Sequence, residues 1–210
     1  TQFTLDSSLA GLASDLPAPF AKSSAAAMPV RFERSALNPL QDTVSFSYGK
    51  LVSGQILRGK SGSQMKAERG VVSFGATPAL PSKNGVWVTG ALSVLDLDQW
   101  RDVLSPSGAG PSLELAGIDL RIGTVDFLGR RFGELFVNGV NQSGIWRSTL
   151  RSREINGDVE WRAQGKGRVA ARLKTLIIPA AAPQRPSSAP KVQDGDLPGL
   201  DVVAESFTIK

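Results

Sequence analysis

The sequence predicts an all-β fold, a strongly curved antiparallel sheet that forms a β-groove, with one short α-helix. Apolar residues recur at every second position in many segments of the 210-residue chain, as in strands with one buried face. The 22 glycines and 13 prolines fall mainly between these segments, where turns are expected. A hydrophobic content of 41% with 20% charged residues is typical of a folded chain.

The candidate strands are rich in Val, Ile, Phe, Trp and Thr and end at Gly, Asn, Ser or Asp. Turn-like sequences at Val137–Gly144 and Glu154–Trp161 predict antiparallel hairpin connections. The candidate strands are Gln2–Leu5, Val30–Glu33, Val44–Tyr48, Gly54–Leu57, Met65–Phe74, Val86–Val94, Ser112–Phe127, Gly133–Val140, Trp146–Arg151, Ile155–Arg162 and Arg168–Ile178.

One segment has a helical rather than a strand-like period. Asp96 is suited to cap a helix near 96–104, and Asp98 lies early, where the helix dipole favours an anion. Leu97, Trp100, Val103 and Leu104 fall on one side. We expect this helix to cover an edge or end of the sheet, with Trp100 as its packing anchor.

Composition also divides the chain. Pro179–Asp196 is rich in Pro, Ala and Ser and has no apolar period, which is typical of a linker. We therefore expect a β-groove segment at 1–179, a linker at 180–196, and the truncated first strand of another repeat at 197–210. The repeat is suggested because Asp196–Ile209 aligns without a gap on Glu114–Phe127.

Both aligned segments change the phase of their alternation. Apolar residues are even-numbered through Ile118, Leu120 and Ile122, and odd-numbered at Val125 and Phe127. A bulge near 123–124 would return all of them to one face and bend the strand. In the second segment, Asp201–Lys210 is predicted to be an edge strand that pairs with residues outside this chain.

The composition excludes several function classes. The chain has no Cys and no His, and no catalytic constellation is visible, so we expect no enzyme activity, no cofactor and no metal site. The net charge of +5 is concentrated between Arg121 and Lys174. Aromatic residues fall largely on the apolar phase, which argues against nucleic-acid binding. The basic residues either form a solvated sheet face or lie near anionic headgroups.

Several distinctive segments follow one another along the chain: DLPAPFAK at Asp15–Lys22, the run Gly85–Leu104, GIDLRIGTVDFLGRRFGEL at Gly117–Leu135, and Gly157–Pro179 followed by LPGLDV. In this order, they resemble the AsmA-like YhdP family of Gram-negative envelope proteins. The resemblance implies the periplasmic part of a protein that an N-terminal helix, outside this piece, anchors in the inner membrane. It also implies a bridge-like conduit that shields phospholipid acyl chains between the inner and outer membranes.

The partners implied are phospholipids, neighbouring repeats of the same longer chain, and the inner membrane through that anchor. The lipid-facing candidates share the apolar phase of their strands: Ile118, Leu120, Ile122, Val125, Phe127, Leu135, Val137, Leu150, Val159, Trp161 and Leu173. Two alternatives remain open. The apolar face could be the core of a closed, dry unit in a periplasmic scaffold or outer-membrane assembly factor, or the chain could be an enzyme.

Overall fold

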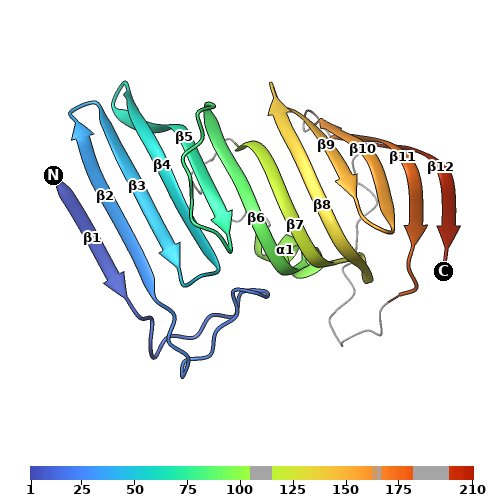
Figure 1. Cartoon of the computed structure of the whole chain (residues 1–210), viewed down its shortest axis with the longest axis horizontal. Coiled ribbons are helices and arrows are strands. Elements are labelled where there is room, and N and C mark those ends of the chain that lie inside the picture. The colour runs from blue at the N-terminus through green and yellow to red at the C-terminus, as the bar shows by residue number, and fades with distance from the viewer. Residues whose placement is uncertain (105–114, 163, 165–166, 182–198) are drawn as a thin grey trace.

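The computed structural model describes residues 1–104, 115–162, 164, 167–181 and 199–210. Twelve strands form one sheet, and one helix lies between the sixth and seventh strands (Figure 1). The strands are β1 Gln2–Ser7, β2 Val30–Asn38, β3 Gln41–Tyr48, β4 Val52–Ser61, β5 Gln64–Phe74, β6 Gly85–Asp96, β7 Leu115–Phe127, β8 Arg130–Gln142, β9 Ile145–Arg151, β10 Ile155–Arg162, β11 Arg168–Ile178 and β12 Gly199–Ile209, and the helix is α1 Leu97–Leu104.

The strands lie side by side in chain order, so β1 and β12 form the two edges of an open sheet (Figure 1). The all-β class with one short helix is confirmed. Neighbouring strands are antiparallel except at β5–β6, β6–β7 and β11–β12, which are parallel. Parallel neighbours need a crossover connection, which α1 helps to form between β6 and β7.

The two predicted turns had different outcomes. Residues Ser143 and Gly144 turn the chain between β8 and β9, with φ angles of 54° and 81°. Asn156 and Gly157 instead lie within β10, where the register with β11 shifts. A Cβ at Gly157 would lie 2.3 Å from the carbonyl oxygen of Arg172, so this glycine permits close backbone approach. The turn before β10 is made by Ser152, whose Oγ accepts hydrogen bonds from the amides of Glu154 and Ile155.

Helix α1 packs as the sequence predicts. The Oδ1 atom of Asp96 accepts a hydrogen bond from the amide of Gln99 at 2.9 Å, which is the expected N-terminal cap. Asp98 accepts hydrogen bonds from the amides of Leu128 and Gly129 in the β7–β8 turn. The Trp100 ring meets the Phe20 ring edge-on, with centroids 5.6 Å apart. The helix is therefore fixed against the end of β7 and against the β1–β2 connection.

One side of the sheet, here called the apolar face, is lined mainly by apolar side chains on every strand. Residues opposite one another on neighbouring strands point to the same side, so the strand register assigns each residue to a face. Over β1–β5 the apolar face includes Phe3, Leu5, Phe32, Val44, Phe46, Tyr48, Ile56, Val72 and Phe74. Over β6–β12 it includes Val88, Leu92, Ile118, Leu120, Ile122, Val125, Leu135, Val137, Leu150, Val159, Trp161, Ala171, Leu173, Val202 and Phe207.

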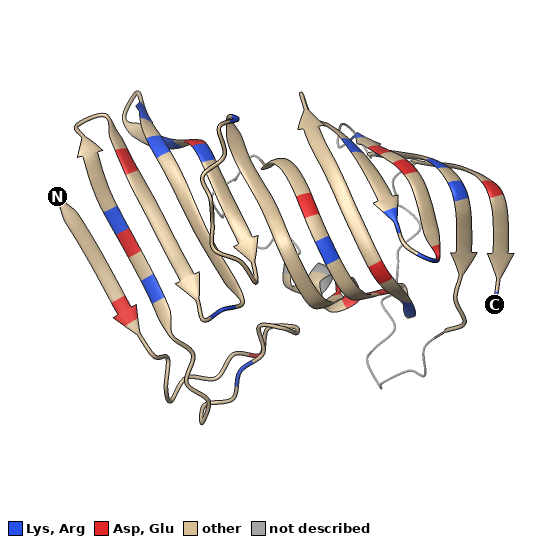
Figure 2. Cartoon of the chain, in the orientation of Figure 1, with Lys and Arg blue, Asp and Glu red and all other residues tan. Residues whose placement is uncertain are grey.

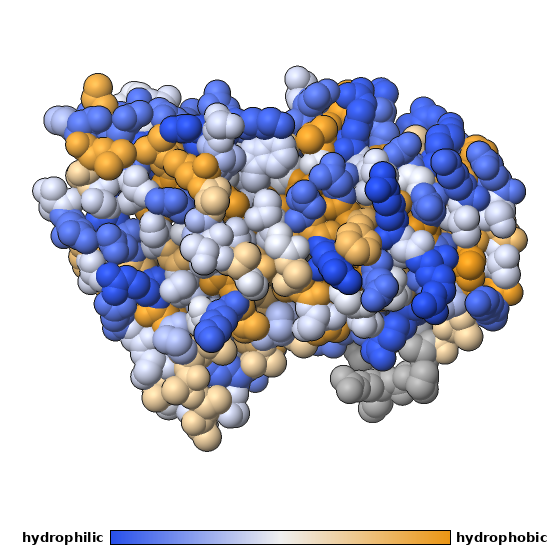
Figure 3. Space-filling model, in the orientation of Figure 1, coloured by the Kyte–Doolittle hydropathy of each residue, from blue (hydrophilic) through white to orange (hydrophobic). Residues whose placement is uncertain are grey.

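The other side is called the polar face. It carries residues such as Gln2, Glu33, Ser45, Asp119 and Glu160 at the alternating positions. In Figure 1 helix α1 lies behind β6 and β7, so that view looks at the polar face. Figure 3 shows the same side covered mainly by hydrophilic side chains, with smaller apolar areas between them.

Candidate functional site

The apolar face over β7–β12 is built from rows of residues that run across the strands. One row passes from Leu120 to Val137 and Leu150, and continues through Gly157 to Leu173. A second row contains Val159, Ala171 and Val202. Because each row crosses successive strands without a charged side chain, the apolar surface is continuous along the sheet rather than confined to one strand pair.

The predicted change of phase occurs, but three strands share it. Ile122 and Val125 both belong to the buried cluster, together with Leu92 of β6 and Phe132 of β8. The unpaired position between them is Gly123, which lies level with Ser93 of β6 and Glu134 of β8.

The pairing resumes in the same register beyond this level, because all three strands change phase together. The sequence predicted an extra residue in β7 alone. A slip of β7 alone would have turned its apolar residues away from those of both neighbours. Glu134 takes a left-handed backbone conformation with φ of 45°, and a Cβ at Gly123 would lie 2.8 Å from the carbonyl oxygen of Ser93.

The aligned C-terminal segment repeats this geometry. In β11 and β12, the pair Leu173–Ala204 is followed by Thr175–Ser206, so Lys174 and Glu205 are passed over. Leu176 and Phe207 then return to the apolar face. In both places the phase changes between two parallel strands, which is the structural counterpart of the sequence similarity. β12 is an edge strand, as predicted.

The predicted lipid-facing residues share the apolar face but differ in exposure. Leu120, Ile122, Val125 and Leu173 are buried. Ile118, Leu135, Val137, Leu150 and Val159 are partly exposed. Trp161 and Phe127 are each 45% exposed, and Phe127 lies at the end of β7, outside the buried cluster. Ile118, Leu120 and Val125 therefore pack together as predicted. Phe127 is placed on the same face by the alternation of β7, but it does not pack against the buried cluster.

Part of the apolar face is covered. The Phe20 ring, from the β1–β2 connection, contacts the rings of Tyr48, Phe74 and Trp100, with centroid distances of 6.0, 6.3 and 5.6 Å. The connection and α1 thus cover the face where β3, β5 and β6 end. Towards the two edges the apolar side chains are open: Phe3, Leu5, Leu200, Val202, Phe207 and Ile209 are all exposed.

An ion cluster on the apolar face was missed by the sequence reasoning. The Asp42 side chain is 2% exposed and is held by Arg58 through Nε at 2.8 Å and Nη2 at 2.7 Å. The Nε atom of Arg34 donates a third hydrogen bond at 2.6 Å. The sequence did hold a signal for this cluster. Arg34 lies two residues after Phe32, and Asp42 two residues before Val44, so the alternation places both charges on the apolar face.

The cluster keeps the Asp42 carboxylate ionised. Hydrogen bonds from Arg58 are the main reason that the pKa of Asp42 lies below its usual range, and burial opposes them. Hydrogen bonds from Arg34 and the charges of both guanidinium groups lower the pKa further. The cluster of two arginines and one carboxylate carries one excess positive charge.

Charges on the polar face form ion pairs across strands, and Figure 2 shows acidic and basic positions on neighbouring strands. Glu160 pairs with Arg147 on the neighbouring strand and with Arg162 on its own strand, and Asp201 pairs with Arg168 and Arg172 across β11–β12. Exposed pairs of this kind contribute little stability each. They show that part of the basic excess between Arg121 and Lys174 is neutralised by neighbouring carboxylates.

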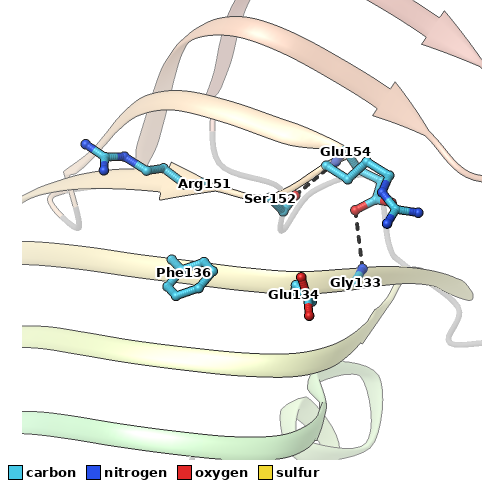
Figure 4. Close-up of a pocket in the computed structure, with 7 residues that line it drawn as sticks. Gly133, Glu134, Phe136, Arg151, Ser152 and Glu154 are labelled. Carbon is cyan, nitrogen blue, oxygen red and sulfur yellow. Dashed lines mark hydrogen bonds between the residues drawn. The ribbon is translucent and has the colours of Figure 1, made fainter.

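A hollow of about 330 Å³ lies on the polar face near the β9–β10 turn (Figure 4). Its lining includes Phe136 and Arg151, which are opposite each other on β8 and β9, and Glu154, whose Oε2 accepts a hydrogen bond from the amide of Gly133. The Arg121 guanidinium lies 5.1 Å from the centroid of the Phe136 ring. The hollow is separated from the predicted lipid-facing residues by the thickness of the sheet.

The fold and the site define an open, all-β sheet protein with one mainly apolar face, which is continuous over β7–β12. The family model described as YhdP protein matches residues 1–210. The chain therefore belongs to the YhdP family, a family of AsmA-like bacterial envelope proteins, as its resemblance predicted. Comparison with curated proteins found no match, and comparison with solved structures found none either.

The helix in the described part of the chain, α1, is not long and apolar enough to cross a bilayer.

Proposed function

We propose that this chain is a segment of a periplasm-spanning, bridge-like conduit that carries phospholipid between the inner and outer membranes. In this proposal the apolar face shields the acyl chains, and the protein performs no chemical step. The full protein would be anchored in the inner membrane of a Gram-negative bacterium. The observation that carries the proposal is the row of apolar side chains that continues across β7–β12 to an open edge.

The energetics favour a shielded path. Moving a methylene group from an apolar surface into water costs about 0.8 kcal/mol. For an acyl chain of about 16 carbons the cost is on the order of 10 kcal/mol. A lipid that moves along the apolar face keeps most of this contact throughout, so that no step exposes the whole chain to water.

Burial on the apolar face supports the open strands as the route. Trp161 on β10 and Val202 on β12 are 45% and 49% exposed, whereas Ile122 on β7 is 3% exposed. Exposed apolar side chains in a row are costly in a soluble protein unless a ligand or partner covers them. The edge strand β12 also has free backbone groups, to which a neighbouring repeat of the longer chain would pair.

The covered middle of the sheet favours a second candidate function. Phe20, Tyr48, Phe74 and Trp100 pack against one another over the ends of β3, β5 and β6. If such packing extended over the whole face in the full protein, the chain would be a dry structural unit of a periplasmic scaffold or outer-membrane assembly factor.

Photo-crosslinking distinguishes the two candidates. Val159 and Glu160 are neighbours on β10 that point to the apolar and polar faces. A photoreactive residue at 159 should crosslink to phospholipid in cells, and one at 160 should not. Mass spectrometry of the purified chain, after lipid extraction, should identify the same phospholipid. Equal labelling at both positions, or crosslinks at 159 only to protein, would contradict the conduit.

A further inference from the structure

We propose that the cluster of Arg34, Asp42 and Arg58 binds the phosphodiester of a phospholipid headgroup. The inference rests on the proposed function, because it gives a place to the headgroup of the lipid whose acyl chains the apolar face shields. The shared chemistry is that of a phosphodiester anion, whether it belongs to a lipid or to a free headgroup.

The cluster lies on the apolar face. Arg34 on β2 is opposite Val44 on β3, and Asp42 on β3 is opposite Arg58 on β4. All three charged residues therefore point to the same side as Phe32, Val44 and Ile56. Charges on an apolar surface are costly unless they are paired. Asp42 pairs with both arginines, which still leaves one positive charge in excess.

The hydrogen bonds within the cluster leave donors of Arg34 available. Arg58 already binds both carboxylate oxygens of Asp42, so the strand pair β3–β4 is held without Arg34. Arg34 contributes only its Nε atom, and within the described part of the chain its two Nη groups have no acceptor. Its side chain is 53% exposed. Guanidinium groups bind phosphate oxygens through two parallel N–H donors, which the Nη groups of Arg34 can supply.

Exposed apolar side chains lie beside Arg34. Phe3 is directly opposite Arg34 on β1, and its ring meets the Phe32 ring edge-on at 6.3 Å. Leu5 follows Phe3 on the same face, and both are exposed, at 56% and 47%. A phosphate held by Arg34 would thus have open apolar surface beside it for the attached acyl chains. A solvated ion cluster with a purely structural role would not need that neighbour.

Arg31 on the same strand provides a matched control. Its side chain is 54% exposed, like that of Arg34, but it points to the polar face and pairs with Asp6 and Glu33. Two carboxylates surround this one guanidinium, so an anion is not expected to bind there. Replacing Arg31 changes the net charge as much as replacing Arg34 and leaves the proposed site intact.

The test measures binding of three probes to the purified chain by calorimetry or NMR titration. Dihexanoyl-phosphatidylglycerol has the phosphodiester and acyl chains, dihexanoylglycerol lacks the phosphodiester, and glycerophosphoglycerol lacks the acyl chains. Arg34→Met should weaken binding of the phospholipid about tenfold or more, the loss expected for a charge-assisted hydrogen-bonded pair. It should leave dihexanoylglycerol binding unchanged. Arg34→Lys should fall between the two proteins, and Arg31→Met should bind like the unaltered chain.

The other outcomes overturn defined parts of the inference. Equal binding of phospholipid and dihexanoylglycerol, unaffected by Arg34→Met, would overturn the headgroup site and leave the conduit standing. Equal binding of glycerophosphoglycerol and phospholipid would identify a general anion site and overturn its assignment to a lipid. An equal loss in Arg31→Met and Arg34→Met would reduce the effect to net charge. If no probe binds, the headgroup site is overturned, and crosslinking at position 159 decides the conduit separately.

Discussion

Several single residues determine how the sheet changes phase without exposing its apolar side. Gly123 lies level with Ser93 and Glu134 on the neighbouring strands, and none of the three takes part in the regular pairing. Ile122 and Val125, on either side of this level, both pack into the buried cluster. Glycine is needed at 123 because the carbonyl oxygen of Ser93 occupies the space of a side chain.

Gly123→Ala should therefore destabilise the chain. The added Cβ would lie 2.8 Å from the Ser93 oxygen, so the backbone of β6 or β7 must move. We expect a loss of about 1–3 kcal/mol in the free energy of unfolding, measured by urea denaturation. Gly133→Ala is the control, since a Cβ there meets no atom within 4 Å. Equal losses in both variants would show that the close approach does not govern stability.

Asp42 gives the stability a defined pH dependence. Its pKa is lowered in the folded chain, chiefly by hydrogen bonds from Arg58, and the unfolded value is about 3.9. The unfolded chain therefore binds a proton at this carboxyl more readily than the folded chain does. The stability that ionised Asp42 contributes is complete above pH of about 4 and is lost as the pH falls through the folded pKa.

Asp42→Asn should be less stable at neutral pH and lose less stability on acidification. Parallel urea titrations at pH 7 and pH 3 test this, and equal acid losses in both proteins would contradict it.

The elements differ in how far the sequence could predict them. Strands such as β10 and β11 follow from their alternation, and α1 follows from its cap and period. Parallel pairing at β5–β6 and β6–β7 could not be predicted, because alternation does not depend on the direction of the neighbour. The contact between Phe20 and Trp100 joins distant parts of the chain and leaves no local pattern.

The sequence predicted part of the candidate site and missed part of it. The row through Leu120, Val137 and Leu150 follows from the alternation of apolar residues together with hairpin pairing. The cluster around Asp42 was missed because its arginines lie on two other strands, although the parity of Arg34 marked it as a charge on the apolar face.

The attachment of α1 to the sheet depends on Asp98. Its two carboxylate oxygens accept hydrogen bonds from the amides of Leu128 and Gly129 at 2.8 and 2.9 Å. Leu128 has a φ of 51°, an uncommon conformation for leucine that these bonds help to hold. Asp98→Ala should cost roughly 1–3 kcal/mol and accelerate hydrogen exchange at both amides. Gln99→Ala, on the same helix, should leave this exchange unchanged. Unaltered exchange in Asp98→Ala would show that the turn holds its conformation without the helix.

At the scale of the whole molecule, the sheet is covered in its middle and open towards its edges. Helix α1 and the β1–β2 connection shield the ends of the central strands, whereas β1 and β12 carry exposed apolar residues. A long sheet with unpaired edges is prone to associate with other strands. In a longer chain, neighbouring repeats would pair with these edges and continue the apolar face, so the edges are where a conduit would join its next segment.

A pair of neighbouring substitutions on β12 tests whether the open face carries lipid. Val202 and Val203 point to the apolar and polar faces and are 49% and 53% exposed. Because both are already exposed, Val202→Asp and Val203→Asp should each leave the chain folded, as measured by circular dichroism and melting. Val202→Asp should reduce the phospholipid recovered with the protein, because a carboxylate loses its hydration against acyl chains and repels the phosphate. Val203→Asp should not reduce it. Ile122→Asp or Leu120→Asp, at buried positions, should unfold the chain, because an unpaired carboxylate there costs several kcal/mol. If Val202→Asp is folded and retains its lipid in full, acyl chains do not pass over β12.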